Sequence, residues 1–511
     1  MTKSSGDRRE IVKQAITAIS RFPWSPLHIF LLLAVYVAVW LPALNLINIG
    51  IDDPCYTDPA ASLYFGHGFR SGMWPWQRHD TFWASNLPLY QFILYLWFHV
   101  VGFSYQAVRF LALAFFLTGT MLAYFGGSNF GLLPTKKHSA IFLLLVLLSS
   151  TAVTSITFGR PDSLCFLIAA SLFYCSSLPA SRLKYLSMFI LGCAAAWCAL
   201  QLAAFLCVGS VIILVLTGKR HWKELAFTAA GGVLGLCLLL IFYHHHHVLD
   251  TFIKAVAPFV GDHKELRIQK TLKFRWGGML DHSMLFLSFA SLTLIADLFY
   301  NKRKYIRRDV LCLLLLLIGI PVGMNALGFF PVYYSWMVFI PVSVIYIKLL
   351  SAHKSLNGFL LYLSFFFVFC AIIAGIPRVV GTVLYLKPLN INVTSNRFAA
   401  SQVKTGDVAL VDTQAYYGVR PYVNSVFFIY ECPWRMDKDE IEKLSLLLMS
   451  DQAFTRLNSI TGNNWQHVAG PVQLPNYNFM FLPFSKFYAM NSFIEISAYR
   501  PTGFSDPDKS K

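Results

Sequence analysis

Three carboxylates lie within seven residues of each other, directly after the first long apolar segment. The stretch "GIDDPCYTDPAASLYFGHG" (residues 50–68) holds Asp52, Asp53 and Asp58, in a chain of which only 13% of the residues are charged. Asp53 and Asp58 each precede a proline, as helix N-caps often do, so we expect Asp58 to be a cap and Asp53 to be either a cap or a functional carboxylate. Asp52 has no such explanation. It is either an ordinary interfacial residue or a general base for an acceptor hydroxyl.

A second acidic turn, "TFGRPDSLCF" (residues 157–166), precedes another apolar segment. Pro161 disfavours helix at Arg160, and Asp162 is placed either to cap the helix that begins at Ser163 or to act in catalysis. The Arg160 guanidinium matches the oxygens of a phosphate, but it could also pair with Asp162 across the turn. The turn thus offers a second carboxylate and a cation for chemistry on a phosphate-linked substrate.

The composition indicates a membrane protein with many spans. Of 511 residues, 56% are hydrophobic and 16% are aromatic, and the charged share is about half that of soluble domains. The net charge of +17 does not indicate nucleic-acid binding, because the basic residues form short runs between apolar segments, which is a signal of membrane topology. About eleven segments are predicted to span the bilayer: residues 27–47, 105–125, 138–154, 163–179, 185–199, 201–217, 225–243, 283–299, 309–328, 333–350 and 356–376.

The basic runs predict which segments share a side of the membrane. If residues 87–103 form an interfacial or re-entrant helix and do not cross, every basic run between spans lies on the cytoplasmic side. The N-terminal segment 1–26 is then cytoplasmic. The segments predicted to share the outer face are the first loop (48–104), the turn at 157–166, the loop 244–282 and all residues after 376.

The composition changes after residue 376. "GDVALVDTQAYYG" and "NSVFFIYE" predict strands, "MDKDEIEKLSLLLMSDQAF" predicts a helix and "NYNFMFLP" predicts a further strand. Residues 377–511 are therefore expected to form a small α/β domain outside the membrane. The predicted fold class is a polytopic α-helical membrane protein, with a catalytic membrane domain over residues 27–376 and this domain attached.

The outer loop 244–282 is basic, against the usual trend for outer loops. Lys254, Lys264, Arg267 and Lys270 either reflect the freedom of long loops from the charge rule or bind anionic headgroups or a lipid phosphate. The four consecutive histidines at the start of the loop cannot all face one ion on a helix. No metal is therefore required, although assistance by a divalent ion stays open.

A late segment, "FFPVYYSWMVFIP" (residues 329–341), places several aromatic residues at the outer end of a predicted span. Tyr333, Tyr334 and Trp336 are expected to form an interfacial aromatic belt, and a platform for a sugar ring is the alternative.

Several short motifs occur in a fixed order over roughly residues 27–350 and resemble those of a known family. They are Asp52, Asp53 and Tyr56 of the first acidic stretch, Tyr90 within "NLPLYQFILYLWF", Arg109 after Val108, "GRPDSLCFLIAA" at residues 159–170, and Tyr333 and Tyr334 in "YYSWMVFIP". In type and order they are similar to motifs of the C-type-fold glycosyltransferases that use polyprenyl-phosphate sugars (glycosyltransferase family 39 type). This family includes the protein O-mannosyltransferases and the lipid A aminoarabinose transferase.

The resemblance implies a function in cell-envelope glycosylation, with no cofactor, at a membrane such as the bacterial inner membrane. A single sugar would pass from a polyprenyl-phosphate donor to a lipid, glycan or protein acceptor, by an inverting displacement with Asp52 (with or without Asp53) as the base and Asp162 in support. Tyr56, Tyr90, Arg109, Tyr333 and Tyr334 would contact substrate. The family's lysine before a Gly-Pro pair is missing near Gln201, so Arg160 or the basic loop would neutralise the donor phosphate.

Two alternatives remain at the level of the sequence. A flippase for a lipid-linked saccharide would need ionisable residues at mid-membrane depth, whereas the acidic residues here gather at one face. A ligase or polymerase that uses a diphosphate-linked donor would also be a transferase.

Overall fold

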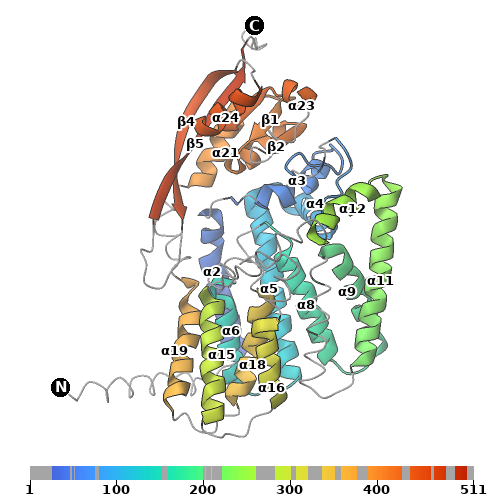
Figure 1. Ribbon diagram of the computed structural model, residues 1–511, viewed down its shortest axis with the longest axis vertical. Helices are drawn as coiled ribbons and strands as arrows, with labels where there is room; N and C mark the ends of the chain where they lie inside the picture. The colour runs from blue at the N-terminus through green and yellow to red at the C-terminus, as the bar shows by residue number, and fades with distance from the viewer. Residues whose placement is uncertain are drawn as a thin grey trace, which may run out of the picture.

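The computed structural model places a bundle of helices beneath a small α/β unit (Figure 1). It describes residues 26–46, 49–50, 52–74, 77, 80–151, 159–199, 202, 209, 221–260, 282–300, 307–319, 336–351, 358–376, 390–428, 438–461, 465–478 and 489–502. The helices of the bundle are α2 (Pro26–Leu46), α3 (Asp52–Tyr64), α4 (Leu89–Val101), α5 (Tyr105–Asn129), α6 (Lys136–Leu148), α8 (Asp162–Ser177), α9 (Arg182–Cys198), α11 (Trp222–His245), α12 (Leu249–Val260), α15 (His282–Tyr300), α16 (Arg307–Leu314), α18 (Trp336–Ser351) and α19 (Phe359–Ile373).

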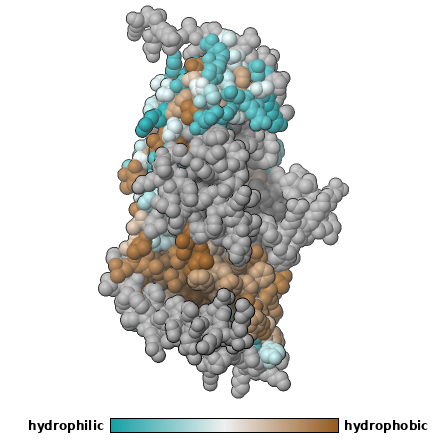
Figure 2. All heavy atoms as spheres, turned by 90° about the vertical axis from the view of Figure 1, so that its left-hand side faces the viewer, coloured by the Kyte–Doolittle hydropathy of each residue, from teal (hydrophilic) through white to brown (hydrophobic). Residues whose placement is uncertain are grey.

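The helical part of the molecule has the surface of a membrane protein. Three described helices, α5, α11 and α15, are long and apolar enough to cross a membrane. Large apolar side chains of α11 face outward, with Val233 and Ile241 more than half exposed. On the face shown in Figure 2, the coloured residues of the bundle are mostly hydrophobic, whereas hydrophilic residues are frequent on the α/β unit. The predicted count of about eleven spans stays a prediction, since much of 201–217 and 309–328 lies outside the described residues.

Helix α4 is too short to cross the bilayer. Its 13 residues extend about 20 Å, whereas the hydrocarbon core is about 30 Å thick. One face is buried at Tyr90, Leu94 and Phe98, while Leu96 and Val100 are exposed. This two-sided character suits the interfacial position predicted for residues 87–103.

Two glycines let α9 and α11 approach closely. A Cβ atom at Gly231 would overlap the carbonyl oxygen of Phe189, and one at Gly235 would overlap the backbone of Cys193. The spacing Gly-x-x-x-Gly places both on one face of α11, a pattern that allows backbones of membrane helices to touch. The indole N–H of Trp197 donates to the carbonyl of Gly235 at 2.8 Å, across the same contact.

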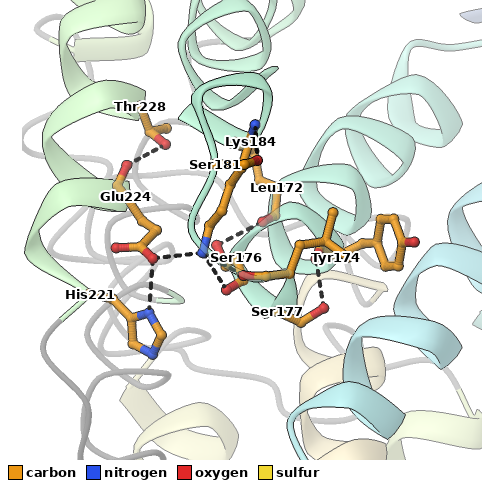
Figure 3. A network of polar contacts seen from close by, with 10 residues as sticks. Leu172, Tyr174, Ser176, Ser177, Ser181, Lys184, His221, Glu224 and Thr228 are labelled. Carbon is orange, nitrogen blue, oxygen red and sulfur yellow. Dashed lines mark hydrogen bonds and ion pairs between the residues drawn. The ribbon is translucent and has the colours of Figure 1, made fainter. Parts of the chain in front are cut away.

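A buried lysine closes the end of the bundle that lies away from the α/β unit (Figure 3). The ammonium of Lys184 donates to the carbonyls of Ser176 and Leu178, at 3.1 and 2.9 Å, and to Glu224 at 2.8 Å. Ser176 lies in the last turn of α8 and Leu178 is the C-cap residue that follows it, so neither carbonyl has a partner within the helix. Lys184 therefore joins α8, α9 and α11 through one cation.

The α/β unit contains a five-stranded mixed sheet in the order β2-β1-β3-β5-β4. Strands β1, β2 and β3 are parallel, and β5 pairs antiparallel with both β3 and β4. Its elements are α21 (Ile391–Gln402), β1 (Val408–Val411), α22 (Tyr416–Val419), β2 (Ser425–Phe428), α23 (Lys438–Glu442), β3 (Leu446–Met449), α24 (Asp451–Thr461), β4 (Trp465–Asn478) and β5 (Ala489–Pro501).

One segment of this unit was expected to be a single helix, and that prediction is wrong. "MDKDEIEKLSLLLMSDQAF" contains the short α23, then strand β3, then the start of α24. All four residues of β3 are buried between β1 and β5. A short apolar run carries no usable periodicity, so position in the sheet decides its structure.

Replacing Lys184 with Ala leaves Glu224 and two helix-end carbonyls without their cation. We expect the free energy of unfolding to fall by about 3–5 kcal/mol, the usual cost of removing one partner of a buried ion pair. Thermal unfolding of the purified protein in detergent measures the change. The matched control is Lys223→Ala, because Lys223 is an exposed lysine on the neighbouring helix. Equal stabilities of the two variants would contradict the prediction.

Candidate active site

The first acidic residues open helix α3, where they meet the second acidic turn. Asp53 is buried and accepts hydrogen bonds from the backbone N–H groups of Gly50 and Gly159. Arg109, from the first turns of α5, has its Nη2 3.5 Å from the Asp53 Oδ2, the oxygen that also accepts from Gly50. A Cβ atom at Gly159 would overlap the Asp53 carboxylate, so only glycine lets the turn approach this closely.

Burial raises the pKa of Asp53 above its ordinary value, although the positive charge of Arg109 and the two backbone N–H groups act in the opposite direction. The neighbouring Asp52 carboxylate adds a smaller upward shift. Asp53 is therefore held as a member of a closed hydrogen-bond network and has little access to an incoming substrate.

Arg160 joins the two acidic turns. Its Nη1 donates to Asp52 at 2.5 Å, and its Nε donates to Asp162 at 2.8 Å. The Arg160 side chain is only 5% exposed, whereas that of Asp52 is 36% exposed. Of these three residues, Asp52 is thus the one that a substrate can reach from solvent.

The other oxygen of Asp162 faces helix α18. The indole N–H of Trp336 lies 3.4 Å from it, and Trp336 is buried against Phe166. Trp336 was expected in an interfacial aromatic belt, and that prediction is wrong because the side chain is inside the bundle. Tyr333 and Tyr334 lie outside the described residues.

Asp162 is not an N-cap. Helix α8 begins at Asp162 itself, its N-cap position is Pro161, and no side chain caps it. The carboxylate is instead paired with Arg160 at 6% exposure, so the capping interpretation is wrong and the Arg160–Asp162 pair is buried.

Asp58 does not cap a helix either. Helix α3 begins six residues earlier, and Asp58 lies within it, buried. Its carboxylate accepts from Arg420 at 2.7 Å and from the hydroxyl of Tyr416 at 2.9 Å. Both partners come from the α/β unit, which is about 360 residues away in the sequence.

Two tyrosines line the region of the acidic turns. The Arg160 guanidinium lies over the ring of Tyr56, 5.2 Å from its centroid. Tyr90 is fully buried within electrostatic range of Asp53 and Asp162. Its hydroxyl has no hydrogen-bond partner among the residues that the structure describes. A buried hydroxyl without a partner is costly, so this group is available to a bound substrate.

The predicted cationic loop is described only in part. Lys254 is exposed on α12, whereas Lys264, Arg267 and Lys270 lie outside the described residues. Within the described part of the chain, no cluster of three or more His, Cys, Asp or Glu side chains could hold a metal ion. His246, in the histidine tract, stacks on Phe82 at 3.8 Å between centroids.

Some residues of the site were not predicted from the sequence. Arg420 and Tyr416 carry no local pattern that indicates their contacts, and Gly159 was noted only as the first residue of its motif. Trp336 was noted for its aromatic character but not as a partner for Asp162. Arg109 was noted only through its motif, and its contact with Asp53 depends on the packing of α5 against α3.

Comparison with solved structures identifies the architecture. ArnT from Cupriavidus metallidurans bound to undecaprenyl phosphate matches with a TM-score of 0.57 and 11% identity, covering 95% of this chain and 100% of that chain. ArnT in the apo state matches with a TM-score of 0.56 and 12% identity, over 92% and 97% of the two chains. No protein-family model matches the sequence, and the curated proteins contain no significant match.

The fold is similar to that of ArnT. The predicted resemblance to C-type-fold glycosyltransferases is therefore confirmed at the level of the overall architecture, including the small sheet after the membrane helices. An oligosaccharyltransferase from Archaeoglobus fulgidus, tethered with an acceptor peptide, also matches, at 10% identity over 91% of this chain and 76% of that chain. Its TM-score of 0.43 is too low to support an argument.

The raised pKa of Asp53 predicts a pH dependence of stability. Folding favours the protonated carboxyl of Asp53. Its contribution to the free energy of unfolding is therefore complete below the ordinary pKa of about 4, and it is lost as the pH rises through the higher pKa of the folded state. Asp53→Asn should therefore gain stability relative to the wild type as the pH increases across this window.

Thermal unfolding in detergent, from about pH 4 to pH 8, measures the difference between variant and wild type. Asp250→Asn serves as the control, because Asp250 is an exposed carboxylate on α12. A difference between Asp53→Asn and wild type that does not change with pH would show that Asp53 does not titrate in this range.

Proposed function

We propose that this protein is a membrane glycosyltransferase that moves a single sugar from a polyprenyl-phosphate donor to an acceptor on the outer face of the membrane. The observation that carries the proposal is the contact of Asp52 and Asp162 through Arg160. It brings together two acidic turns that are separated by about 110 residues in the sequence. The ArnT-like fold supports the same reading, and a solved ArnT holds undecaprenyl phosphate.

Asp52 is the general base in this proposal. The acceptor hydroxyl or amine attacks the anomeric carbon and forms the new glycosidic bond, while the bond from that carbon to the phosphate oxygen breaks. The electron pair leaves with the polyprenyl phosphate, and the acceptor's proton passes to the Asp52 carboxylate. The displacement inverts the anomeric centre, so no covalent sugar-enzyme intermediate forms.

Arg160 acts mainly as a positioning residue for the base. Two of its nitrogens are already committed to Asp52 and Asp162, so its guanidinium fixes where the Asp52 carboxylate points. Neutralisation of the leaving phosphate is then assigned to the basic outer loop, of which Lys254 is the described member. Tyr90 and Tyr56 complete the contacts to the sugar-phosphate.

The remaining assignments follow from this chemistry. The donor's hydrocarbon tail stays in the bilayer, so the acidic turns, the loop 244–282 and the domain over residues 377–511 belong to the extracytoplasmic face of a plasma membrane. The N-terminal segment 1–26 lies on the cytoplasmic side. The acceptor is a lipid, a glycan or a protein that reaches this face.

Replacing Asp52 with Asn removes the proton acceptor but keeps the size of the side chain. We expect sugar transfer to fall by about 10²–10⁴-fold, the usual contribution of a general base, with normal expression and membrane insertion. Mass spectrometry of glycolipids and glycoproteins, from cells with wild-type protein, variant or no protein, measures the product. Asp439→Asn, an exposed carboxylate of α23, is the control. Unchanged transfer in Asp52→Asn would exclude the proposed base.

Replacing Arg160 with Lys keeps the charge but removes the forked donor group. A lysine presents a point charge and cannot hold two carboxylates in the same fixed geometry. We expect transfer to fall roughly tenfold or more while the protein stays folded, as judged by size-exclusion chromatography and the same product analysis. Full activity of Arg160→Lys would show that charge alone is needed at this position.

A further inference from the structure

A polar cavity lies between the first outer loop and the α/β unit. Its volume is about 330 Å³, within the lower range of small-molecule sites. The loop contributes one wall and the segment around the start of β2 contributes the other. The lining residues are Asp58, Ser62, Gly66, His67, Arg70, Ser71, Gly72, Asp80, Arg420, Asn424, Ser425 and Val426.

The floor of the cavity is built from buried polar groups. Asp58 and Arg420 form the ion pair that joins α3 to the α/β unit. Ser62 lies one turn further along α3 and is only 3% exposed. The side chain of Ser62 lines the cavity, and its hydroxyl makes no hydrogen bond within the described residues.

Open hydrogen-bonding groups also surround the rim. As far as the described chain extends, no ion pair or hydrogen bond holds the side chains of Arg70, His67 or Asn424. Together they offer guanidinium, imidazole and amide groups in addition to the buried hydroxyl. A wall of this kind suits a ligand that carries many hydroxyl groups, because each hydroxyl can both donate and accept a hydrogen bond.

Among the residues that the structure describes, the charges of the lining are balanced. Two carboxylates, Asp58 and Asp80, accompany two guanidinium groups, Arg70 and Arg420. His67 adds no charge near neutral pH, because burial and the positive charges of Arg420 and Arg70 lower its pKa. A cavity for a phosphate or a uronic acid would be expected to carry an excess of positive charge. The described part of the lining lacks that excess, which favours a neutral ligand.

We propose that this cavity binds a neutral saccharide. Helix α3 relates the cavity to the proposed active site: Asp52 is its first residue, and Asp58, in the lining of the cavity, is six residues on, about 9 Å along the helix axis. The residues of α3 from Asp53 to Ser62 are all buried, so the helix offers no open path between the two places, and the cavity is a binding site separate from Asp52.

The test uses the full-length protein in lipid nanodiscs and measures ligand binding without any donor. Mannotriose, maltotriose and galactotriose are the neutral probes, and mannose phosphate and inorganic phosphate are the anionic probes, all observed by saturation-transfer NMR. We expect binding of at least one neutral probe and an at least tenfold weaker affinity in Asn424→Trp, which puts a much larger side chain into the lining of the cavity. Arg70→Ala should weaken the same binding. Thr394→Trp and Arg397→Ala, exposed positions on α21, are the matched controls and should bind as the wild type does.

Three results would overturn the proposal: binding of the anionic probes alone, no binding of any neutral probe, or neutral binding that Asn424→Trp leaves unchanged. Native mass spectrometry of the same samples with undecaprenyl phosphate reports separately on the donor. If neutral saccharides bind in the cavity and the lipid phosphate does not bind, the cavity is supported and the donor assignment fails. If the lipid phosphate binds and the saccharides do not, the donor assignment is supported and the cavity proposal fails.

Discussion

The burial of carboxylates at one end of the bundle is the constraint on which the rest of the structure depends. Asp53, Asp58 and Asp162 are all nearly inaccessible to water; Asp53 and Asp58 each face an arginine from another segment, and Asp162 faces Arg160 of its own turn. A buried charge without its partner costs several kcal/mol, so the Asp53–Arg109 and Asp58–Arg420 pairs each tie two segments together. Through Arg109, Arg160 and Arg420, the acidic helix α3 is held by α5, by the turn before α8 and by the α/β unit. Asp52 remains partly exposed, whereas Asp53, Asp58 and Asp162 are buried.

The position of the α/β unit follows from the same constraint. Strand β1 lies between the parallel strands β2 and β3, so the chain runs from β1 to one side of the sheet and then crosses to the other side. In open α/β sheets, ligands usually bind at such a switch point, outside the carboxyl ends of the strands. Here the segment that follows β1 contains Gln414, Tyr416 and Arg420, whose side chains form hydrogen bonds with residues of the first loop (48–104). The place where such sheets commonly bind a ligand is therefore occupied by contacts with that loop and with α3.

The sequence predicted the class of fold and the residues of the two acidic turns, and it offered the Arg160–Asp162 pair as one alternative, but it did not predict the other contacts of these residues. Apolar segments, basic runs and the Arg-Pro-Asp turn are local patterns, and local patterns identify elements. The partners of Asp58 and Asp162 come from Arg420 and Trp336, which are distant in the sequence. Both aspartates also resemble N-caps locally. The predicted cap at Asp58 is wrong because a tertiary ion pair with Arg420 determines its role, and at Asp162 the capping alternative is wrong because the carboxylate pairs with Arg160 of the same turn. The strand β3 was missed for a similar reason, since its burial in the sheet overrides the helical residues on either side.

Two neighbouring aspartates of α3 differ in burial, and this difference gives one a structural role and leaves the other accessible to a substrate. Asp53 is surrounded by two backbone N–H groups and Arg109, so its oxygens are occupied and its position is fixed. Asp52, one residue earlier, shares only Arg160 and keeps a third of its surface open. A base must accept a proton from outside the protein, and only the open carboxylate can do so. The same helix then continues to Asp58 and Ser62 in the lining of the polar cavity, so the Asp58–Arg420 pair joins the α/β unit to the helix on which the proposed base lies.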